Sequence, residues 1–151
     1  MSIRRDFPDL PPVWALGVVA AQWAAARWLP LARLDASWAV PLGWAALAAG
    51  LGLIGWAALW FRRRRTSIEP GEVPSALIVE GPFRLNRNPI YTGMALFLIG
   101  AGLAMGAWSA AFLALAFAPI VTRRFILDEE AALRAAFGPA AERYIAATRR
   151  W

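Results

Sequence analysis

One stretch of the chain limits its possible folds more than any other, because residues 40–61 contain no charged side chain. At about 1.5 Å per residue, a helix of this length crosses a hydrocarbon layer that is about 30 Å thick. Arg62, Arg63, Arg64 and Arg65 follow directly, and such a cationic block is typically retained on the cytoplasmic side of a membrane. The pattern predicts a membrane-spanning helix whose C-terminal end is cytoplasmic.

Three further apolar runs extend this prediction to the whole chain. They cover about residues 13–29, 90–106 and 110–121, and the last two are separated by a reversal at residues 108–109. We expect an all-α, polytopic membrane protein with about four transmembrane helices, of which the last two form a hairpin. Residues 125–150 predict two amphipathic cytoplasmic helices after the last span.

Several boundaries of this arrangement are marked by particular residues. The run at 110–121 is short for a full span, so the sequence leaves open a half-buried arm or a helix that continues past Arg123. Gly138 and Pro139 separate the two amphipathic helices. Residues 76–79 predict a short strand or a bulge. We expect residues 1–151 to form a single integral membrane domain.

The charge of the chain favours a membrane partner. Charged residues make up 17% of the sequence, against about a quarter in soluble domains. The net charge of +6 is carried by Arg alone, because the chain has no Lys. A basic balance also suits nucleic acid, but no soluble basic module remains outside the apolar runs. We therefore expect anionic lipid headgroups as neighbours and no nucleic-acid partner.

The arginine block also predicts an orientation. With this block inside, the number of spans places both termini in the cytoplasm, and Arg4, Arg5, Arg123 and Arg124 fall on the same side. Arg4 and Arg5 resemble the start of a signal peptide, but no small-residue cleavage site follows, so we expect a retained anchor. The Ala- and Arg-rich composition is typical of a GC-rich bacterium, which predicts the bacterial inner membrane.

Cysteine and histidine are both absent from the chain. Their absence excludes disulfides, thiolate nucleophiles, zinc sites built from either residue, and an imidazole base. We therefore expect no metal site.

A glycine pattern inside the second run resembles a dinucleotide-binding fingerprint. Residues 50–55 fit G-x-G-x-x-G, but the fingerprint requires a strand before it and a helix after it. Here it lies within an uninterrupted apolar run, where glycines more often let helices pack closely. Gly102 and Gly106 form a G-x-x-x-G for which we expect the same role.

Three acidic residues in a row open the region after the last run. On a helix, a 100° step per residue places Glu129 and Glu130 beside the apolar stripe, and Asp128 falls on the far side. A carboxylate beside an apolar face requires a cation or hydrogen-bond donors. Two alternatives follow: an ion pair with an arginine, or a site for a ligand that is cationic or carries hydroxyl groups. The arginines open to such a pair are Arg84, Arg87 and Arg123.

A second polar group lies at the start of the third run. Pro89 presets the first turn of a helix, and Asn88 is predicted to cap its exposed amides. Capping does not explain why Arg84, Arg87 and Tyr91 crowd the same helix start.

These two segments together resemble the isoprenylcysteine carboxyl methyltransferase and phospholipid methyltransferase superfamily. The family pattern is approximately G-P-[FY]-R-x-x-R-H-P-x-Y-x-G, then a hairpin of two spans, then E-E-x-x-L-x-x-x-F-G-x-x-Y-x-x-Y. The resemblance covers about residues 75–151, whereas residues 1–65 match only as generic spans. The matching positions are Gly81, Pro82, Phe83, Arg84, Arg87, Pro89, Tyr91, Gly93, Glu129, Glu130, Leu133, Phe137, Gly138 and Tyr144.

The chain departs from the family pattern at two positions. Asn88 stands where the family has His, and Ala141 stands where the family has the first Tyr after Phe-Gly. Asn still donates and accepts hydrogen bonds, so the resemblance still implies cofactor binding, but not a role that needs an imidazole proton.

The resemblance implies S-adenosylmethionine-dependent methyl transfer, of class EC 2.1.1, by an integral membrane enzyme. Residues 1–65 are then two scaffold spans, and residues 66–151 are the cofactor-binding catalytic half. The implied cofactor-binding residues are Arg84, Arg87, Asn88, Pro89, Tyr91, Gly93, Glu129 and Glu130. The candidate catalytic residues are Arg87, Tyr91 and Glu130, and the candidate substrate-binding residues are Tyr144 and Arg150.

The acceptor that the resemblance implies is a lipid or a prenylated small molecule that enters from the bilayer. A carboxylate of the isoprenylcysteine type is already anionic at neutral pH, whereas a phospholipid amine must first lose a proton. The absence of His slightly favours the carboxylate, although Glu130 or Tyr91 is available to take a proton. Two alternatives stay open: a non-catalytic or regulatory membrane protein that keeps the fold, and a nicotinamide-dependent membrane reductase of related architecture.

Overall fold

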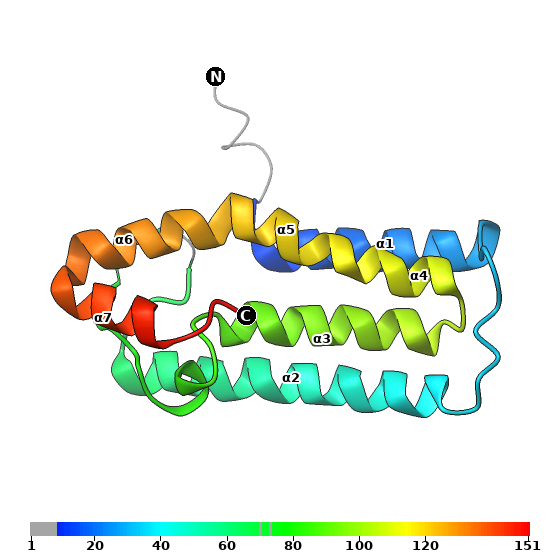
Figure 1. The fold of residues 1–151 in the computed structure, drawn as a ribbon, viewed down its shortest axis with the longest axis horizontal. Helices are drawn as coiled ribbons and strands as arrows, with labels where there is room; N and C mark the ends of the chain where they lie inside the picture. Colours follow the sequence, from blue (N-terminus) through cyan, green and yellow to red (C-terminus); the bar gives the residue numbers. More distant parts are fainter. Residues whose placement is uncertain (1–8, 70, 73) are drawn as a thin grey trace, which may run out of the picture.

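The helices of the protein follow the apolar runs. The computed structural model describes residues 9–69, 71–72 and 74–151, so Arg4 and Arg5 lie outside the described residues. The long helices lie side by side (Figure 1), and the last of them runs without a break from Trp108 to Phe137. The elements are α1 (Pro11–Trp28), α2 (Ala39–Arg64), a 3-10 turn (Gly81–Arg84), α3 (Pro89–Ala104), α4 (Trp108–Leu113), α5 (Phe117–Val121), α6 (Leu127–Phe137) and α7 (Pro139–Ala147).

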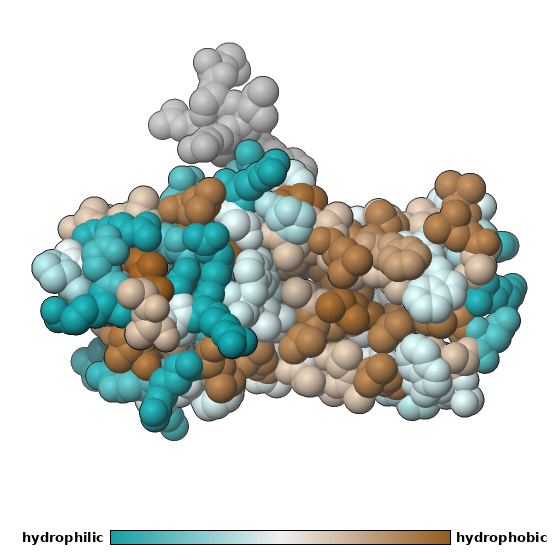
Figure 2. Space-filling model, in the orientation of Figure 1, coloured by the Kyte–Doolittle hydropathy of each residue, from teal (hydrophilic) through white to brown (hydrophobic). Residues whose placement is uncertain are grey.

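The bundle has the length and surface that a membrane protein requires. Two helices, α2 and the continuous helix Trp108–Phe137, are long and apolar enough to cross a membrane, and α3 is apolar but shorter. Figure 2 shows apolar side chains around the middle of the bundle and hydrophilic side chains gathered at its ends. The described residues contain no strand, which confirms the all-α class. Two of the predicted spans are confirmed as candidates, and the count of about four stays a prediction.

The contact between α2 and α3 depends on glycines. A Cβ atom added to Gly50 would lie 2.5 Å from the Gly93 carbonyl oxygen, and one added to Gly100 would lie 2.5 Å from the Gly43 carbonyl oxygen. The two backbones can approach this closely only because these positions lack side chains. The G-x-G-x-x-G pattern therefore lies inside α2 and serves helix packing, at least through Gly50.

The second helix of the hairpin is longer than its run of apolar residues, 110–121, suggested. Gly106, with φ +67°, turns the chain between α3 and Trp108, so Gly106 serves the turn instead of the helix contact expected of it. The helix then continues past Arg123, through a π-helical turn (Thr122–Ile126), into α6. This excludes the short half-buried arm. Gly138, with φ +51°, separates α6 from α7, which confirms the predicted break.

The region between α2 and α3 was predicted less well. Residues 76–79 form neither a strand nor a bulge. Instead, Ile78 is buried in a small cluster with Ala57, Phe83 and Tyr144. Hydrophobic burial against the end of α2, without any partner strand, explains the apolar character of this segment.

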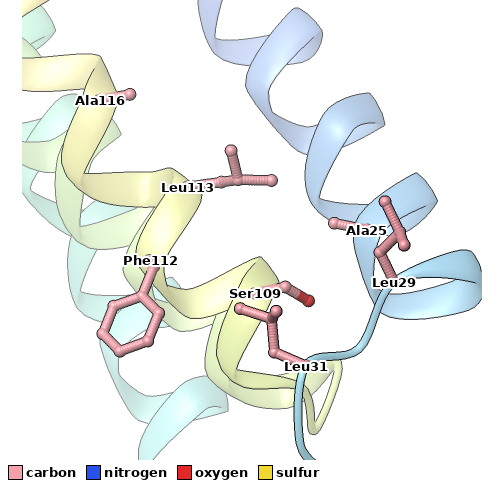
Figure 3. Close-up of a pocket in the computed structure, with 7 residues that line it drawn as sticks. All are labelled: Ala25, Leu29, Leu31, Ser109, Phe112, Leu113 and Ala116. Atoms are coloured by element: carbon pink, nitrogen blue, oxygen red, sulfur yellow. The ribbon is translucent and has the colours of Figure 1, made fainter.

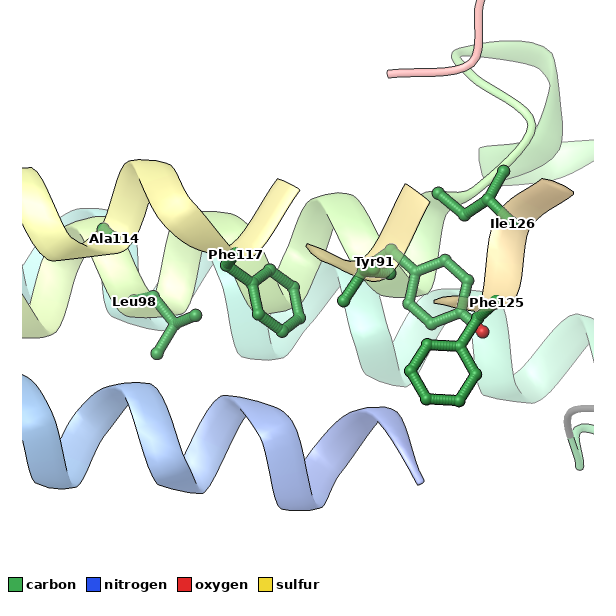
Figure 4. Packing of buried hydrophobic residues seen from close by; sticks show 7 residues of the cluster. Tyr91, Leu98, Ala114, Phe117, Phe125 and Ile126 are labelled. Atoms are coloured by element: carbon green, nitrogen blue, oxygen red, sulfur yellow. The ribbon is translucent and has the colours of Figure 1, made fainter. Parts of the chain in front are cut away.

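The core of the bundle lies between α3 and the continuous helix that follows it. Its buried side chains are seen from close by in Figure 4 and are Tyr91, Leu98, Ala114, Phe117, Val121, Phe125 and Ile126. The fully buried Gln22 of α1 joins this core by donating hydrogen bonds to the Leu98 carbonyl at 2.8 Å and the Ala110 carbonyl at 2.9 Å. One amide therefore ties α1 to both neighbouring helices.

Candidate functional site

Several of the predicted site residues meet in the part of the bundle where α3 begins and α6 begins. Residues 87–88 precede α3, Glu129 and Glu130 lie on the first turn of α6, and residues 148–151 return beneath them after α7. These segments are far apart in the sequence, and side-chain hydrogen bonds hold them together.

Glu130 is the centre of a buried ion-pair cluster. Its side chain is 5% exposed. Arg150 forms a two-pronged contact with it, with Nε 2.8 Å from Oε1 and Nη2 2.8 Å from Oε2. Arg87 Nη2 donates a third bond to Oε1 at 3.0 Å. Of the two alternatives left open by the sequence, the ion pair with Arg87 is therefore present, and Arg150 is a second partner that the sequence did not reveal.

Arg87 also holds the chain that follows α7. Its Nη1 donates to the Ile145 carbonyl at 2.7 Å and to the Thr148 carbonyl, and its backbone N–H donates to the Arg149 carbonyl at 2.8 Å. Hydrogen bonds with Glu130 raise the pKa of the Arg150 guanidinium above its usual value. Residues 145–150 are thus fixed across the start of α3 by one arginine.

Asn88 does not cap α3, contrary to the prediction. Its side chain forms no hydrogen bond with the first amides of the helix. Instead, Nδ2 donates to the Arg150 carbonyl at 3.0 Å, while the Asn88 backbone N–H donates to Asn86 Oδ1 at 3.0 Å. The side chain is drawn away because residues 149–150 lie within its reach, which a local capping rule does not consider.

Tyr91 and Glu129 form a second pair beside the first. The Tyr91 hydroxyl donates to Glu129 Oε1 at 2.5 Å. Tyr91 is buried, Glu129 is half-buried and Asp128 is exposed, which confirms the predicted placement of the acidic residues on α6. Glu129 Oε2 accepts no hydrogen bond from the described residues.

The remaining site residues support the cluster from outside or lie apart from it. The Tyr144 hydroxyl donates to the Phe83 carbonyl at 2.8 Å, and burial raises its pKa to about 12. Arg84 is exposed and forms no ion pair within the described part of the chain. Pro89 is buried at the start of α3, and Gly93 faces Gly50 of α2 in the helix contact.

Two residues with evident structural roles were not singled out from the sequence. Asn86 holds the Asn88 amide, and its position two residues before that amide is the signal of an Asx turn. Trp60 of α2 packs against Gly81, where an added Cβ would lie 2.0 Å from the indole nitrogen. Trp60 and Gly81 are too far apart in the sequence for a local pattern to predict their contact.

Two recesses lie at the opposite end of the bundle. The larger has a volume of about 500 Å³ and is an apolar groove between α1 and α4, lined by Leu29, Leu31 and Phe112 among others (Figure 3). The smaller has a volume of about 170 Å³ and is lined in part by Arg27 and Arg33. Neither belongs to the cluster around Glu130.

A comparison with protein families decides the relationship of the chain. The family model described as phospholipid methyltransferase matches residues 38–140. The chain belongs to the phospholipid methyltransferase family. The match runs from the start of α2 through α6, so it includes Arg87 and the Glu129–Glu130 pair but leaves Tyr144 and Arg150 outside. No curated protein and no solved structure matches the chain. The family and the apolar helices both fit a membrane methyltransferase.

Proposed function

We propose that the protein is an S-adenosylmethionine-dependent methyltransferase whose acceptor is a lipophilic molecule in the membrane. The family match supplies the reaction type. The observation that carries the cofactor assignment is the clustering of Arg87, Tyr91, Glu129 and Glu130 at one end of the bundle. These are the residues that the resemblance implied.

Two polar atoms of the cluster suit the groups that S-adenosylmethionine presents. Glu129 Oε2 has no hydrogen-bond partner among the described residues, so it is free to accept from ribose hydroxyls or an ammonium group. Arg87 Nε is buried and has no partner in the same part of the chain. An orphaned guanidinium N–H is a suitable donor to a carboxylate. The exposed Arg84 is available as a second donor.

Glu130 acts differently from Glu129 in this proposal. Both of its oxygens are engaged by Arg87 and Arg150, so it orients Arg87 toward the cofactor carboxylate as a positioning residue. Direct contact between Glu130 and the cofactor would require Arg150 to leave. Pro89, Asn88 and Tyr144 then fix the start of α3 and the segment after α7 around the same space.

The chemistry requires fixed geometry more than acid–base groups. S-adenosylmethionine, when bound, supplies a sulfonium methyl group that an acceptor oxygen or nitrogen attacks in line as the carbon–sulfur bond breaks. An isoprenylcysteine-type carboxylate needs no base. A phospholipid amine must first release a proton, and the Glu129 carboxylate, which accepts the Tyr91 hydrogen bond, is the group available to receive it.

Binding of the methyl donor tests the proposal directly. Isothermal titration of the detergent-solubilised chain with S-adenosylmethionine should give one site, and Glu129→Gln should weaken it by about tenfold or more, because a charged hydrogen bond is lost. Glu142→Gln, in an exposed ion pair with Arg134, is the matched control and should bind as tightly as wild type. Absence of binding at millimolar cofactor would refute the methyltransferase assignment, and binding of a nicotinamide cofactor instead would favour the reductase.

The acceptor is best identified from product. Radiolabelled methyl donor is supplied with total membrane lipid, and the labelled species is separated and hydrolysed. A base-labile methyl ester indicates a carboxylate acceptor, whereas a base-stable label on a headgroup nitrogen indicates a phospholipid amine. Label found only in water-soluble molecules would contradict a lipophilic acceptor.

We also propose four spans in the bacterial inner membrane, with both termini in the cytoplasm. The cationic residues that follow α2 support this orientation. Because the chain has no Cys, single cysteines at the exposed positions Ser37 and Ser75 report the two loops. A membrane-impermeant maleimide should label Ser37→Cys in intact spheroplasts and Ser75→Cys only after permeabilisation. The reverse pattern would overturn the orientation, and labelling of both from one side would exclude α2 as a span.

A further inference from the structure

The smaller recess, at the end of the bundle remote from Glu130, has an unusual lining. It has a volume of about 170 Å³. The loop after α1 and the turn between α3 and α4 enclose it, and its two charged lining residues are Arg27 and Arg33. The other lining residues are Ala26, Pro30, Met105, Gly106 and Ala107.

Arg27 and Arg33 have no carboxylate partner. Neither forms an ion pair with any described residue, and Asp35, the acid of the same loop, forms none either. In the described part of the chain, every other arginine lies in or after the cationic end of α2, near the start of α3, or beyond α5. Both arginines are exposed and line the same recess, so an anion that enters it meets two guanidinium groups with no competing carboxylate.

The recess is held in a fixed shape by backbone hydrogen bonds. The Leu34 N–H donates to the Gly106 carbonyl at 2.9 Å, and the Trp108 N–H donates to the Ala32 carbonyl at 3.3 Å. Arg33 and Ala107 form an isolated antiparallel bridge between them. The loop that carries Arg33 is therefore joined to the turn on the opposite wall, and the site needs little ordering before it binds a ligand.

The recess lies at an end of the bundle that carries exposed tryptophans. The exposed indoles of Trp28, Trp38 and Trp108 lie at the same end, at the end of α1 and the starts of α2 and α4. Tryptophan gathers where the hydrocarbon layer meets the headgroups. The phosphate groups of phospholipids lie at that level.

We propose that this recess binds a phosphate group, and that a phospholipid headgroup in the adjacent leaflet supplies it. At about 30 Å³ per water, a volume of about 170 Å³ equals five or six waters, which is room for a phosphate diester. The planar guanidinium of each arginine matches two phosphate oxygens. The site lies at the other end of the bundle from the cluster around Glu130, and it does not depend on the proposed methyl transfer.

Native mass spectrometry of the full chain in detergent micelles tests this assignment. The probes are dihexanoyl phosphatidylglycerol, dihexanoylglycerol, which has the same chains without phosphate, and inorganic phosphate. Wild type should bind the phosphatidylglycerol, and Arg27→Gln/Arg33→Gln should weaken that binding by about tenfold or more, because charge-assisted hydrogen bonds are lost. Dihexanoylglycerol should bind weakly and equally to both proteins.

Matched variants separate this site from a general effect of charge. Arg134→Gln/Arg143→Gln removes the same charge from α6 and α7 and should leave lipid binding unchanged. Arg27→Lys/Arg33→Lys keeps the charge without the planar guanidinium and should give an intermediate loss of lipid affinity. This variant replaces the glutamine variant in the test if the glutamine variant does not fold.

Three results would overturn the proposal. One is a glutamine variant that binds phosphatidylglycerol as tightly as wild type does. Another is an equal loss in the Arg134→Gln/Arg143→Gln control. The third is inorganic phosphate that binds with the same arginine dependence and competes equally with the lipid, which would assign the site to free phosphate.

Discussion

Substitution of Glu130 by Gln should destabilise the protein far more than the same substitution at Glu142. Glu130 is 5% exposed and faces Arg87, which is 10% exposed, and Arg150, which is 37% exposed. Breaking a fully buried ion pair by removing one partner costs about 3–5 kcal/mol. Because Arg150 can turn toward water and Gln keeps one acceptor oxygen, we expect a loss of about 2–3 kcal/mol in the free energy of unfolding.

Glu142 provides the reference for this measurement. The Glu142 side chain is 58% exposed, and its ion-pair partner Arg134 is 42% exposed. Ion pairs that are this exposed contribute about 0–1 kcal/mol to the free energy of unfolding. Unfolding of both variants in mixed micelles, with SDS as denaturant and helix content as the signal, gives the two differences under one set of conditions. Equal losses for Glu130→Gln and Glu142→Gln would refute the conclusion that the buried cluster holds this end of the bundle together.

Three further substitutions test the packing. Gly50→Ala should lower the free energy of unfolding by about 1–3 kcal/mol, because the new Cβ meets the backbone of α3. The Cβ of Gly52→Ala meets nothing within 4 Å, so this variant should raise the free energy of unfolding by about 0.5–1 kcal/mol. Unfolding in SDS measures both, and an unchanged value for Gly50→Ala would contradict the close contact. Gln22→Leu should lower it by about 1–2 kcal/mol, because two interhelical hydrogen bonds are lost, and an unchanged value would contradict the role of that amide. Burial raises the pKa of Tyr144 to about 12, so the folded protein favours the protonated hydroxyl. The contribution of this hydroxyl to the free energy of unfolding is complete below pH ~10, and about 2–3 kcal/mol of it is lost as the pH rises from ~10 to ~12. Tyr144→Phe should remove this part of the pH dependence, and an identical alkaline profile would refute it.

The parts of the fold that the sequence predicted well are those determined by local pattern. The apolar runs gave the helices α1 to α3 within a few residues of their observed ends. The 100° periodicity placed Glu130 inside and Asp128 outside on α6. Gly138 with Pro139 gave the break before α7. In each case, the physical cause lies within a few residues of the feature.

The parts that were missed depend on partners distant in the sequence. The sequence left open whether the helix ends near Arg123 or continues, and it continues because Phe125 and Ile126 bury against the core on its other face. Asn88 was assigned to its own helix end, but it binds the Arg150 carbonyl. No local pattern reveals that the segment after α7 returns to the start of α3.

The same long-range contact explains how the chain accommodates Asn88 at the position where the resembled pattern has His. In this structure, the side chain at position 88 is a hydrogen-bond donor to the Arg150 carbonyl, and an amide N–H fills that role as well as an imidazole N–H does. What the replacement removes is a group that exchanges a proton near neutral pH. The substitution therefore preserves the attachment of residues 148–151 to the start of α3. In the proposed reaction, an amine acceptor would then have to release its proton to Glu129, whereas an acceptor that is already anionic needs no proton transfer.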